Sequence, residues 1–278
     1  MINRWIGIVA VGLMLIANAA LVVRDFLPGW SAGEPPQSRA LQLRDGQEFR
    51  TQLGIFNQEG RRIGHSWSLC KCDEQLVIVR HRSVFQELPL NLGADIGLLR
   101  VDTDLMYGAG ARLDNVRVKV LGLGIQVLFE GEYFPPDDFA CKWQVGEQRG
   151  ELVVSSLLTR GLGDAVRPFE SLTGLFVGRT WRVEILNPLA GILSDWGARG
   201  MTADDMVVTV TGVESVEYMG ETVQAFVIEA EALRAWVAPA GRVIRQEFDM
   251  PIIGKLIMVE EPYDDALRTE MLYRALRQ

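Results

Sequence analysis

Short runs of alternating apolar and polar residues, separated by brief polar turns, make up most of the chain after residue 46. Successive side chains of a β-strand point to opposite faces, so this alternation is typical of strands in a half-exposed sheet. The turns, such as Gln58-Glu59-Gly60, are short enough for hairpins between neighbouring strands. After a meander over residues 48–85, strands are expected at Val116–Val120, Ile125–Glu132, Phe139–Val145, Glu151–Leu158, Thr180–Leu186, Met206–Val213 and Thr222–Glu229.

The stretch RAWVAPAGRVIRQEF, residues 234–248, is the clearest hairpin of the sequence. Pro239 supplies a fixed φ and Gly241 a permissive one, which together favour a tight turn. Its mixed residues need no active site to explain them, because a partly exposed sheet carries polar residues on one or both faces. The strands expected in this region are 221–230, 233–238, 242–249 and 255–260.

Two segments are predicted to be helical, Asn91–Met106 and Tyr263–Arg277. In the second segment acidic residues come first and arginines last, which complements the helix dipole. No expected strand is followed by a long segment of clear helical periodicity, which argues against a parallel α/β sheet. The pattern therefore predicts an α+β domain that is mostly antiparallel β.

An apolar run from Trp5 to Val23 opens the chain. As a helix, a run of this length crosses the roughly 30 Å hydrocarbon core of a bilayer. Arg4 precedes it and Arg24-Asp25 adds no net charge after it, so the positive-inside rule leaves the main domain on the extracytoplasmic (periplasmic) side. Ala17-Asn18-Ala19 also fits a signal-peptide cleavage site. Residues 1–24 are thus a transmembrane anchor or a cleaved signal, and both readings export the chain.

Residues 25–45 contain several prolines and glycines and little periodicity, which predicts a tether. Trp30 lies just beyond the apolar run and is expected at the membrane interface, where an amphipathic ring is favoured. The folded domain is expected over 46–278. Its repeated strand and glycine motifs also raise the hypothesis of two similar halves, at about 46–160 and 165–278.

Composition limits the classes of function. The net charge of −8 argues against a general nucleic-acid binder, whose footprint is a basic surface. The chain has two histidines, too few for a multi-histidine metal centre. No G-x-S-x-G, H-E-x-x-H or Walker pattern occurs, and no glycine motif completes a dinucleotide fingerprint. We therefore expect no cofactor, no metal, no catalytic set and no nucleic-acid partner.

The three cysteines leave three alternatives open. Cys70 and Cys72 share one face of a strand, because they lie two residues apart. In an exported protein, a disulfide from Cys141 to Cys70 or Cys72 is the ordinary outcome, with one thiol left over. Three unpaired buried thiols are the second alternative, and a metal site with His65 the third, although C-x-C is shorter than zinc-site spacing. A cysteine nucleophile would need His65 or His81 beside it, and no motif indicates such an activated thiol.

Four of the seven tryptophans fall in expected strands. Such residues are commonly part of a core. If they lined one side of a curved sheet, they would instead form an apolar cavity. The four candidate lining residues are Trp67, Trp143, Trp181 and Trp236.

Several stretches resemble a group of uncharacterised exported bacterial proteins. G-x-x-V-x-A-F-V-I-E at 220–229 and A-W-V-A-P-A-G-R-V-I-R-Q-E at 235–247 carry the resemblance, with LGIFNQEGRRIGHSW at 53–67 and TGLFVGRTWRVEILNPL at 173–189. Members of this group are similar in fold to bacterial lipoprotein carriers. The resemblance implies a strongly curved antiparallel sheet, or incomplete barrel, with one or two helices. The resemblance carries over a fold but not an activity, because the chain lacks a plausible Cys-His-Asp triad.

Three functions are compatible with these features. The first is a membrane-anchored, extracytoplasmic, non-enzymatic module that binds an apolar, lipid-like ligand or a membrane-protein partner such as a transporter. The second is a structural accessory subunit of a membrane complex. The third is a cysteine-dependent envelope enzyme. We rank them in that order, because the sequence predicts an anchor and a curved sheet and contains several tryptophans, whereas it lacks a catalytic motif.

Overall fold

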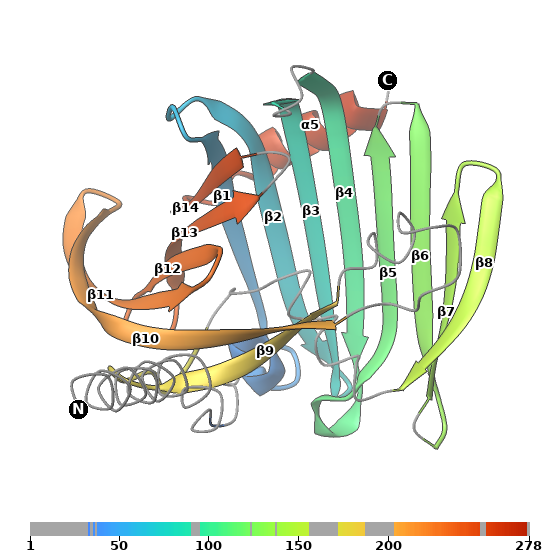
Figure 1. Ribbon diagram of the computed structural model, residues 1–278, viewed down its shortest axis with the longest axis horizontal. Helices are drawn as coiled ribbons and strands as arrows, with labels where there is room; N and C mark the ends of the chain where they lie inside the picture. The colour runs from blue at the N-terminus through green and yellow to red at the C-terminus, as the bar shows by residue number, and fades with distance from the viewer. Residues whose placement is uncertain are drawn as a thin grey trace, which may run out of the picture.

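The computed structural model describes residues 38–89, 95–122, 124–136, 138–155, 172–186, 203–250 and 254–276, together with Gly33 and Pro36. A single 14-stranded antiparallel sheet dominates this part of the chain (Figure 1). The strands are β1 (Glu48–Asn57), β2 (Arg62–Asp73), β3 (Leu76–Pro89), β4 (Asp95–Tyr107), β5 (Leu113–Gly122), β6 (Ile125–Phe134), β7 (Asp138–Val145), β8 (Gln148–Ser155), β9 (Thr180–Leu186), β10 (Ala203–Tyr218), β11 (Glu221–Ala230), β12 (Leu233–Val237), β13 (Val243–Met250) and β14 (Gly254–Glu261). The described helical elements are α5 (Asp265–Leu276) and the 3₁₀ turns η2 (Arg39–Gln42) and η3 (Ala109–Ala111).

The order of strands in the sheet follows the chain with one long-range junction. Strands β1 to β8 form one meander and β9 to β14 another, and β1 pairs with β14 to join them. The order begins at β8 and ends at β9, so the described sheet is not closed. Figure 1 shows β4 to β8 as one wall and β9 to β12 bending away from it. The predictions of a mostly antiparallel, curved, unclosed sheet and of a helix near the C-terminus are confirmed.

The predicted helix at Asn91–Met106 is wrong, because residues 95–107 form β4 between β3 and β5. Over residues 100–105 of this strand charged residues alternate with uncharged ones, and this two-residue period is typical of a strand. The charged positions are Arg100, Asp102 and Asp104, and the positions between them are Val101, Thr103 and Leu105.

The two faces of strands β2 to β7 differ in chemistry. We call inner the face that carries the cluster around Cys70, Val79 and Leu105, and outer the opposite face. The inner positions of β5 to β7 are almost all apolar, whereas the outer positions carry most of the charged residues, such as Arg117 and Lys142. This division follows from the alternation of the sequence, because each register pairs inner residues with inner residues.

Helix α5 packs on the outer face of β2 to β4. Trp67 and Val84 of the sheet contact Met271 of the helix, and all three are buried. The side chain of Asp264 caps the helix, since its Oδ1 accepts from the backbone N–H groups of Ala266 and Leu267. The helix therefore covers part of the sheet and closes one side of the domain.

The last residues of the predicted tether are folded onto the sheet. Ala40 is buried in the inner cluster with Cys70 and Cys72. Ser38 forms an isolated bridge with Leu172, and Gly33 forms one with Trp181 of β9. Proline and glycine content predicted a tether, but the apolar side chains of Ala40, Leu41 and Leu43 pack against the inner cluster. This segment therefore links the edge strand β9 to the first meander.

The predicted anchor or signal, Trp5–Val23, and Trp30 lie outside the described residues. No described helix is long and apolar enough to span a membrane. Strands β1 to β8 fall within 46–160, and β9 to β14 within 165–278. The similarity of these two halves remains a prediction.

Candidate functional site

Rows of cross-strand neighbours place polar and apolar side chains side by side on the inner face. Residues directly opposite each other on adjacent strands have Cβ atoms about 4.5–5.5 Å apart, so each row is a line of contacts. One row, from β1 to β7, is Leu53, Ser66, Ser83, Val101, Val120, Val127 and Val145. The next row is Thr51, Ser68, His81, Thr103, Val118, Phe129 and Trp143.

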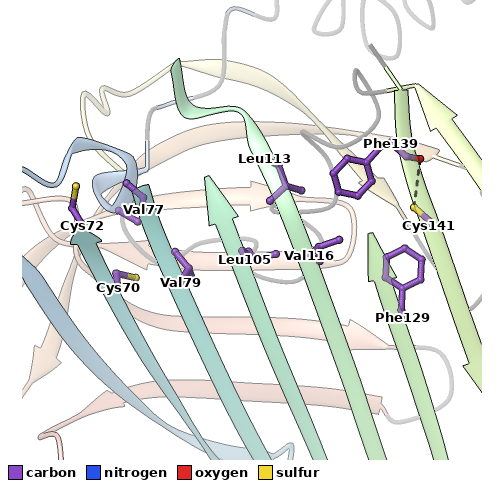
Figure 2. Packing of buried hydrophobic residues seen from close by; sticks show 11 residues of the cluster. Cys70, Cys72, Val77, Val79, Leu105, Leu113, Val116, Phe129, Phe139 and Cys141 are labelled. Carbon is purple, nitrogen blue, oxygen red and sulfur yellow. Dashed lines mark hydrogen bonds between the residues drawn. The ribbon is translucent and has the colours of Figure 1, made fainter. Parts of the chain in front are cut away.

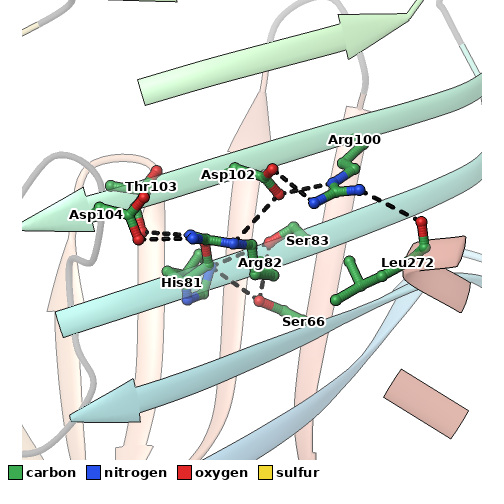
Figure 3. A network of polar contacts seen from close by, with 9 residues as sticks. All are labelled: Ser66, His81, Arg82, Ser83, Arg100, Asp102, Thr103, Asp104 and Leu272. Carbon is green, nitrogen blue, oxygen red and sulfur yellow. Dashed lines mark hydrogen bonds and ion pairs between the residues drawn. The ribbon is translucent and has the colours of Figure 1, made fainter. Parts of the chain in front are cut away.

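The polar ends of these rows meet on β2, β3 and β4. We call the group Ser66, Ser68, His81, Ser83 and Thr103 the polar cluster. His81 Nε2 lies 2.9 Å from the Ser66 hydroxyl and 3.0 Å from that of Ser83 (Figure 3). The other ring nitrogen, Nδ1, lies 2.7 Å from the Ser68 hydroxyl. The Ser66 and Ser83 hydroxyls are themselves 2.9 Å apart. Both imidazole nitrogens are thus held by neighbouring hydroxyls, which fixes the ring.

Thr103 is the unsatisfied member of the polar cluster. It sits directly opposite His81 and is 0% exposed. Its Oγ1 has no hydrogen-bond partner in the described part of the chain. A buried hydroxyl without a partner is costly, so its retention needs an explanation.

The charged residues of the same strands turn to the outer face. Arg82 bonds Asp104 at 2.7 Å, and Arg100 bonds Asp102 at 2.7 Å. Arg100 also donates to the carbonyl of Leu272 near the C-terminal end of α5 (Figure 3). A cation at that end of a helix is favoured by the helix dipole. Arg100 thus joins the sheet to α5, and the four charged side chains lie on the face opposite the polar cluster.

The apolar ends of the two rows are only partly covered. We call Val101, Val118, Val120, Val127 and Val145 the valine wall. Each of these side chains is half-buried, whereas Leu105 and Val116 in the next row are fully buried. A contiguous apolar surface that the described chain leaves partly open is a feature of binding sites. The valine wall adjoins the polar cluster, because Val101 pairs with Ser83 and Val118 with Thr103.

The predicted disulfide is wrong for this structure. Cys70 and Cys72 lie on β2 and share the inner face, as their spacing predicts, and Cys141 lies on β7. Strands β3, β4, β5 and β6 separate them, and Figure 2 shows Val79, Leu105 and Val116 in between. A disulfide needs Cα atoms within about 7 Å. All three cysteines are buried and outside any disulfide, which matches the second alternative of the sequence.

The environment of the Cys141 thiol argues against a nucleophile at that position. Burial raises the pKa of the Cys141 thiol to about 12, whereas a reactive thiolate needs a lowered pKa. The two histidines lie on opposite faces of the sheet, His65 on the outer face and His81 on the inner face. Among the described residues, no group of three or more His, Cys, Asp or Glu is placed to hold a metal ion.

The four candidate tryptophans do not line one cavity. Trp67 packs under α5, Trp181 joins the core of β9 to β13, and Trp143 borders the inner cluster of the first meander. Trp236 belongs to a fourth cluster. Its indole N–H donates to Glu214 at 2.8 Å, and the guanidinium carbons of Arg234 and Arg245 lie 4.7 Å and 5.2 Å from its ring. Three of the four are core residues, and only Trp143 lies beside the valine wall.

Two depressions lie at the margins of the first meander. One, of about 320 Å³, is lined by Leu41, Leu43, Cys72 and Val77 with a few polar neighbours. The other, of about 410 Å³, lies beside Trp143 near the edge strand β8 and is lined mainly by charged and polar residues. Both depressions have the volume of a small ligand site, but the lining of the first is more apolar than that of the second.

Comparison with known proteins adds a likeness in fold. No protein-family model and no curated protein matches the sequence. Among solved structures, the chain is similar to a β-barrel-like protein of domain of unknown function DUF1849 from Brucella abortus. The likeness covers 80% of this chain and 100% of that chain, with 10% identity and a TM-score of 0.45. The resemblance to lipoprotein carriers remains a prediction.

The sequence reasoning missed four members of the polar cluster. It considered His81 only as a partner for a thiol. The available signal was the pair of patterns S-x-S at 66–68 and H-x-S at 81–83, because each places two polar side chains on one face of an otherwise apolar strand. Thr103 was missed because the sequence analysis predicted a helix at Asn91–Met106, where the structure has β4.

His65 is part of an outer-face network that supports helix α5. Its ring stacks on Trp67 with 5.5 Å between ring centroids. Arg62 forms two hydrogen bonds with Glu261, at 3.0 Å and 2.5 Å, and also lies 3.3 Å from His65 Nδ1. Burial and the Arg62 charge lower the pKa of His65, and Glu261 only partly opposes them. The folded protein therefore favours the neutral imidazole.

This network predicts a pH dependence of stability. Because the pKa of His65 is lowered in the folded state, the unfolded chain binds the proton first as the pH falls. The contribution is fully present above about pH 6.5, the ordinary histidine value, and is lost as the pH falls toward the folded pKa. We expect the urea midpoint of the protein to drop between pH 7 and pH 5.5, and His65→Gln to show a shallower drop. Equal slopes for the two proteins would contradict the assignment.

Proposed function

We propose that this protein is a non-enzymatic, extracytoplasmic binding module that holds an apolar ligand on the inner face of its curved sheet. The valine wall is the observation that carries the proposal. It supplies apolar side chains from four adjacent strands, each side chain only half-buried. Neighbouring strands lie about 4.8 Å apart, so Val101 to Val145 spans about 14 Å, the scale of a short hydrocarbon chain.

The chemistry of the surroundings supports binding over catalysis. Ligand sites are mostly apolar with a few convergent polar groups, and the polar cluster stands beside the valine wall in that way. The raised pKa of Cys141 argues against a thiolate at that position. The lipoprotein-carrier resemblance of the sequence agrees with an apolar ligand. The apolar run Trp5–Val23 would hold such a module at the membrane surface.

The proposal predicts that a charge on the valine wall removes a bound molecule. Val127 and Leu128 are adjacent on β6, with Val127 on the inner face and Leu128 on the outer. A carboxylate at 127 would have to be buried against an apolar ligand, which is costly, whereas one at 128 would not. We expect the full chain to carry a near-stoichiometric apolar molecule, and Val127→Asp to reduce its occupancy about tenfold or more, for a loss of about 1.4 kcal/mol of binding or more.

The measurement is mass spectrometry of solvent extracts from the full chain, purified in one mild detergent. Leu128→Asp is the matched control and should keep the molecule at the level of the unsubstituted protein. Circular dichroism would establish that both variants are folded. An extract without any recurrent molecule, or an equal loss in the two variants, would overturn the proposal. A stoichiometric membrane protein in place of a small molecule would favour the accessory-subunit function.

A further inference from the structure

The polar cluster gives the valine wall a chemical preference. We infer that the ligand carries an uncharged hydrogen-bonding group, such as an alcohol, which the Thr103 hydroxyl binds while the hydrocarbon part of the ligand lies on the valine wall. This inference rests on the proposed function and names the class of ligand that the same face accepts. It makes the ligand a neutral amphiphile.

Position is the first argument. Thr103 is the last polar residue of its row, between His81 and Val118. A group bound at Thr103 therefore lies between the His81 ring, whose nitrogens are held by serine hydroxyls, and the Val118 side chain of the valine wall. A molecule with one polar end and one apolar end matches this order of side chains.

The unsatisfied hydroxyl is the second argument. Thr103 Oγ1 is buried and lacks a partner in the described part of the chain, while the hydroxyls of Ser66, Ser68 and Ser83 are all engaged. Valine has nearly the same shape as threonine and would avoid the cost of an unpaired hydroxyl. A threonine at this place is explained if a ligand group completes its hydrogen bond.

Charge is the third argument, and it selects a neutral group. From β1 to β7, the described residues of the two rows include no Lys, Arg, Asp or Glu, and Glu260, which continues the first row opposite Leu53 on β14, is paired with Arg242. Arg82 and Arg100 are engaged by carboxylates on the outer face, and Arg80, next to His81 in the chain, lies on that same outer face. Moving an ionised group against the valine wall without a partner of opposite charge is much costlier than moving a hydroxyl.

The test is photoaffinity labelling of the full chain in mild detergent with three probes. The probes share a twelve-carbon chain with a diazirine and end in a hydroxyl, a carboxylate or a methyl group. Peptide mapping would report labelling of β4 to β7. We expect the alcohol probe to label this region about fivefold more than either of the others, since one neutral hydrogen bond contributes about 1 kcal/mol.

Thr103→Val is the deciding variant. It should reduce labelling by the alcohol to the level of the methyl probe and leave the methyl probe unchanged. It should also raise the melting temperature of the ligand-free protein by a few degrees, because it removes an unpaired buried hydroxyl. Thr209→Val is the matched control, since Thr209 lies on β10 and is hydrogen-bonded to Thr180. It should leave labelling by all three probes unchanged.

The outcomes separate the two proposals. Equal labelling by the alcohol and methyl probes, or the same alcohol labelling in Thr103→Val, would overturn the inference and leave the apolar site standing. Preference for the carboxylate probe would overturn it as well. A lower melting temperature in Thr103→Val would show that the hydroxyl already has a partner, and the inference would fail. If no probe labels β4 to β7, the proposed function fails with it.

Discussion

Replacing Trp67 with alanine is expected to lower the free energy of unfolding by about 3–5 kcal/mol, the cost of removing a large buried aromatic side chain. Trp67 is 2% exposed and packs between the sheet and Met271 of α5. Its indole N–H donates to Gln52 Oε1 at 2.8 Å, and the same oxygen accepts from the backbone N–H of Asp264 at 2.9 Å. One side chain thus supports two strands and the start of the helix. Urea unfolding followed by circular dichroism would measure the loss.

Two further variants separate packing from hydrogen bonding at this position. Trp67→Phe keeps most of the buried ring and loses the bond to Gln52, so we expect a loss of about 1–2 kcal/mol. Trp143→Ala removes the same type of residue from a half-buried place and should cost clearly less than Trp67→Ala. A similar cost at 67 and 143 would mean that α5 does not depend on Trp67.

Gly131→Val is expected to destabilise the protein by about 3 kcal/mol through overpacking. A Cβ atom at residue 131 would lie 2.3 Å from Phe139 Cε1 and 2.9 Å from Val116 Cγ1. Both neighbours are 0% exposed, so neither side chain has free space to move into. The glycine is needed here because the Phe139 ring lies across the backbone of β6. Chemical denaturation of the purified variant would give the value.

A double-mutant cycle with Phe139→Ala tests this explanation. Phe139→Ala alone should cost about 3–5 kcal/mol, because it opens a cavity in the inner cluster. In the double variant, the valine at 131 would occupy part of that cavity. The combined loss should therefore be smaller than the sum of the two single losses by at least about 1 kcal/mol. Strictly additive losses would exclude a direct clash between these residues.

Much of the sheet could be predicted from the sequence because its two-residue period is strong. The hairpin around Pro239 and Gly241 forms β12 and β13, with Gly241 at a φ of 85°. The segment of β4 was mistaken for a helix, since its leucines and methionine obscure the alternation of Arg100 and Asp102 with Val101 and Thr103. Propensity was outweighed by pairing with β3 and β5 on both sides.

The candidate site could be predicted only in part, for a physical reason. Alternation reveals which side chains share a face, as it did for Cys70 and Cys72. It does not reveal which residue of the next strand stands opposite, because register depends on turns and bulges elsewhere. The sequence therefore could not show that His81 lies opposite Thr103. It also could not show how far Cys70 lies from Cys141.

The pairing of β1 with β14 has a consequence for how the chain folds. Most contacts of the two meanders join neighbouring hairpins, which form early because short loops close at little entropic cost. The Arg62–Glu261 contact at the junction spans 199 residues. Contacts so distant along the chain slow folding. We therefore expect two preformed half-sheets whose docking limits the rate. Until they dock, β1 and β14 both present unpaired backbone edges, at which the half-formed protein is most prone to aggregate.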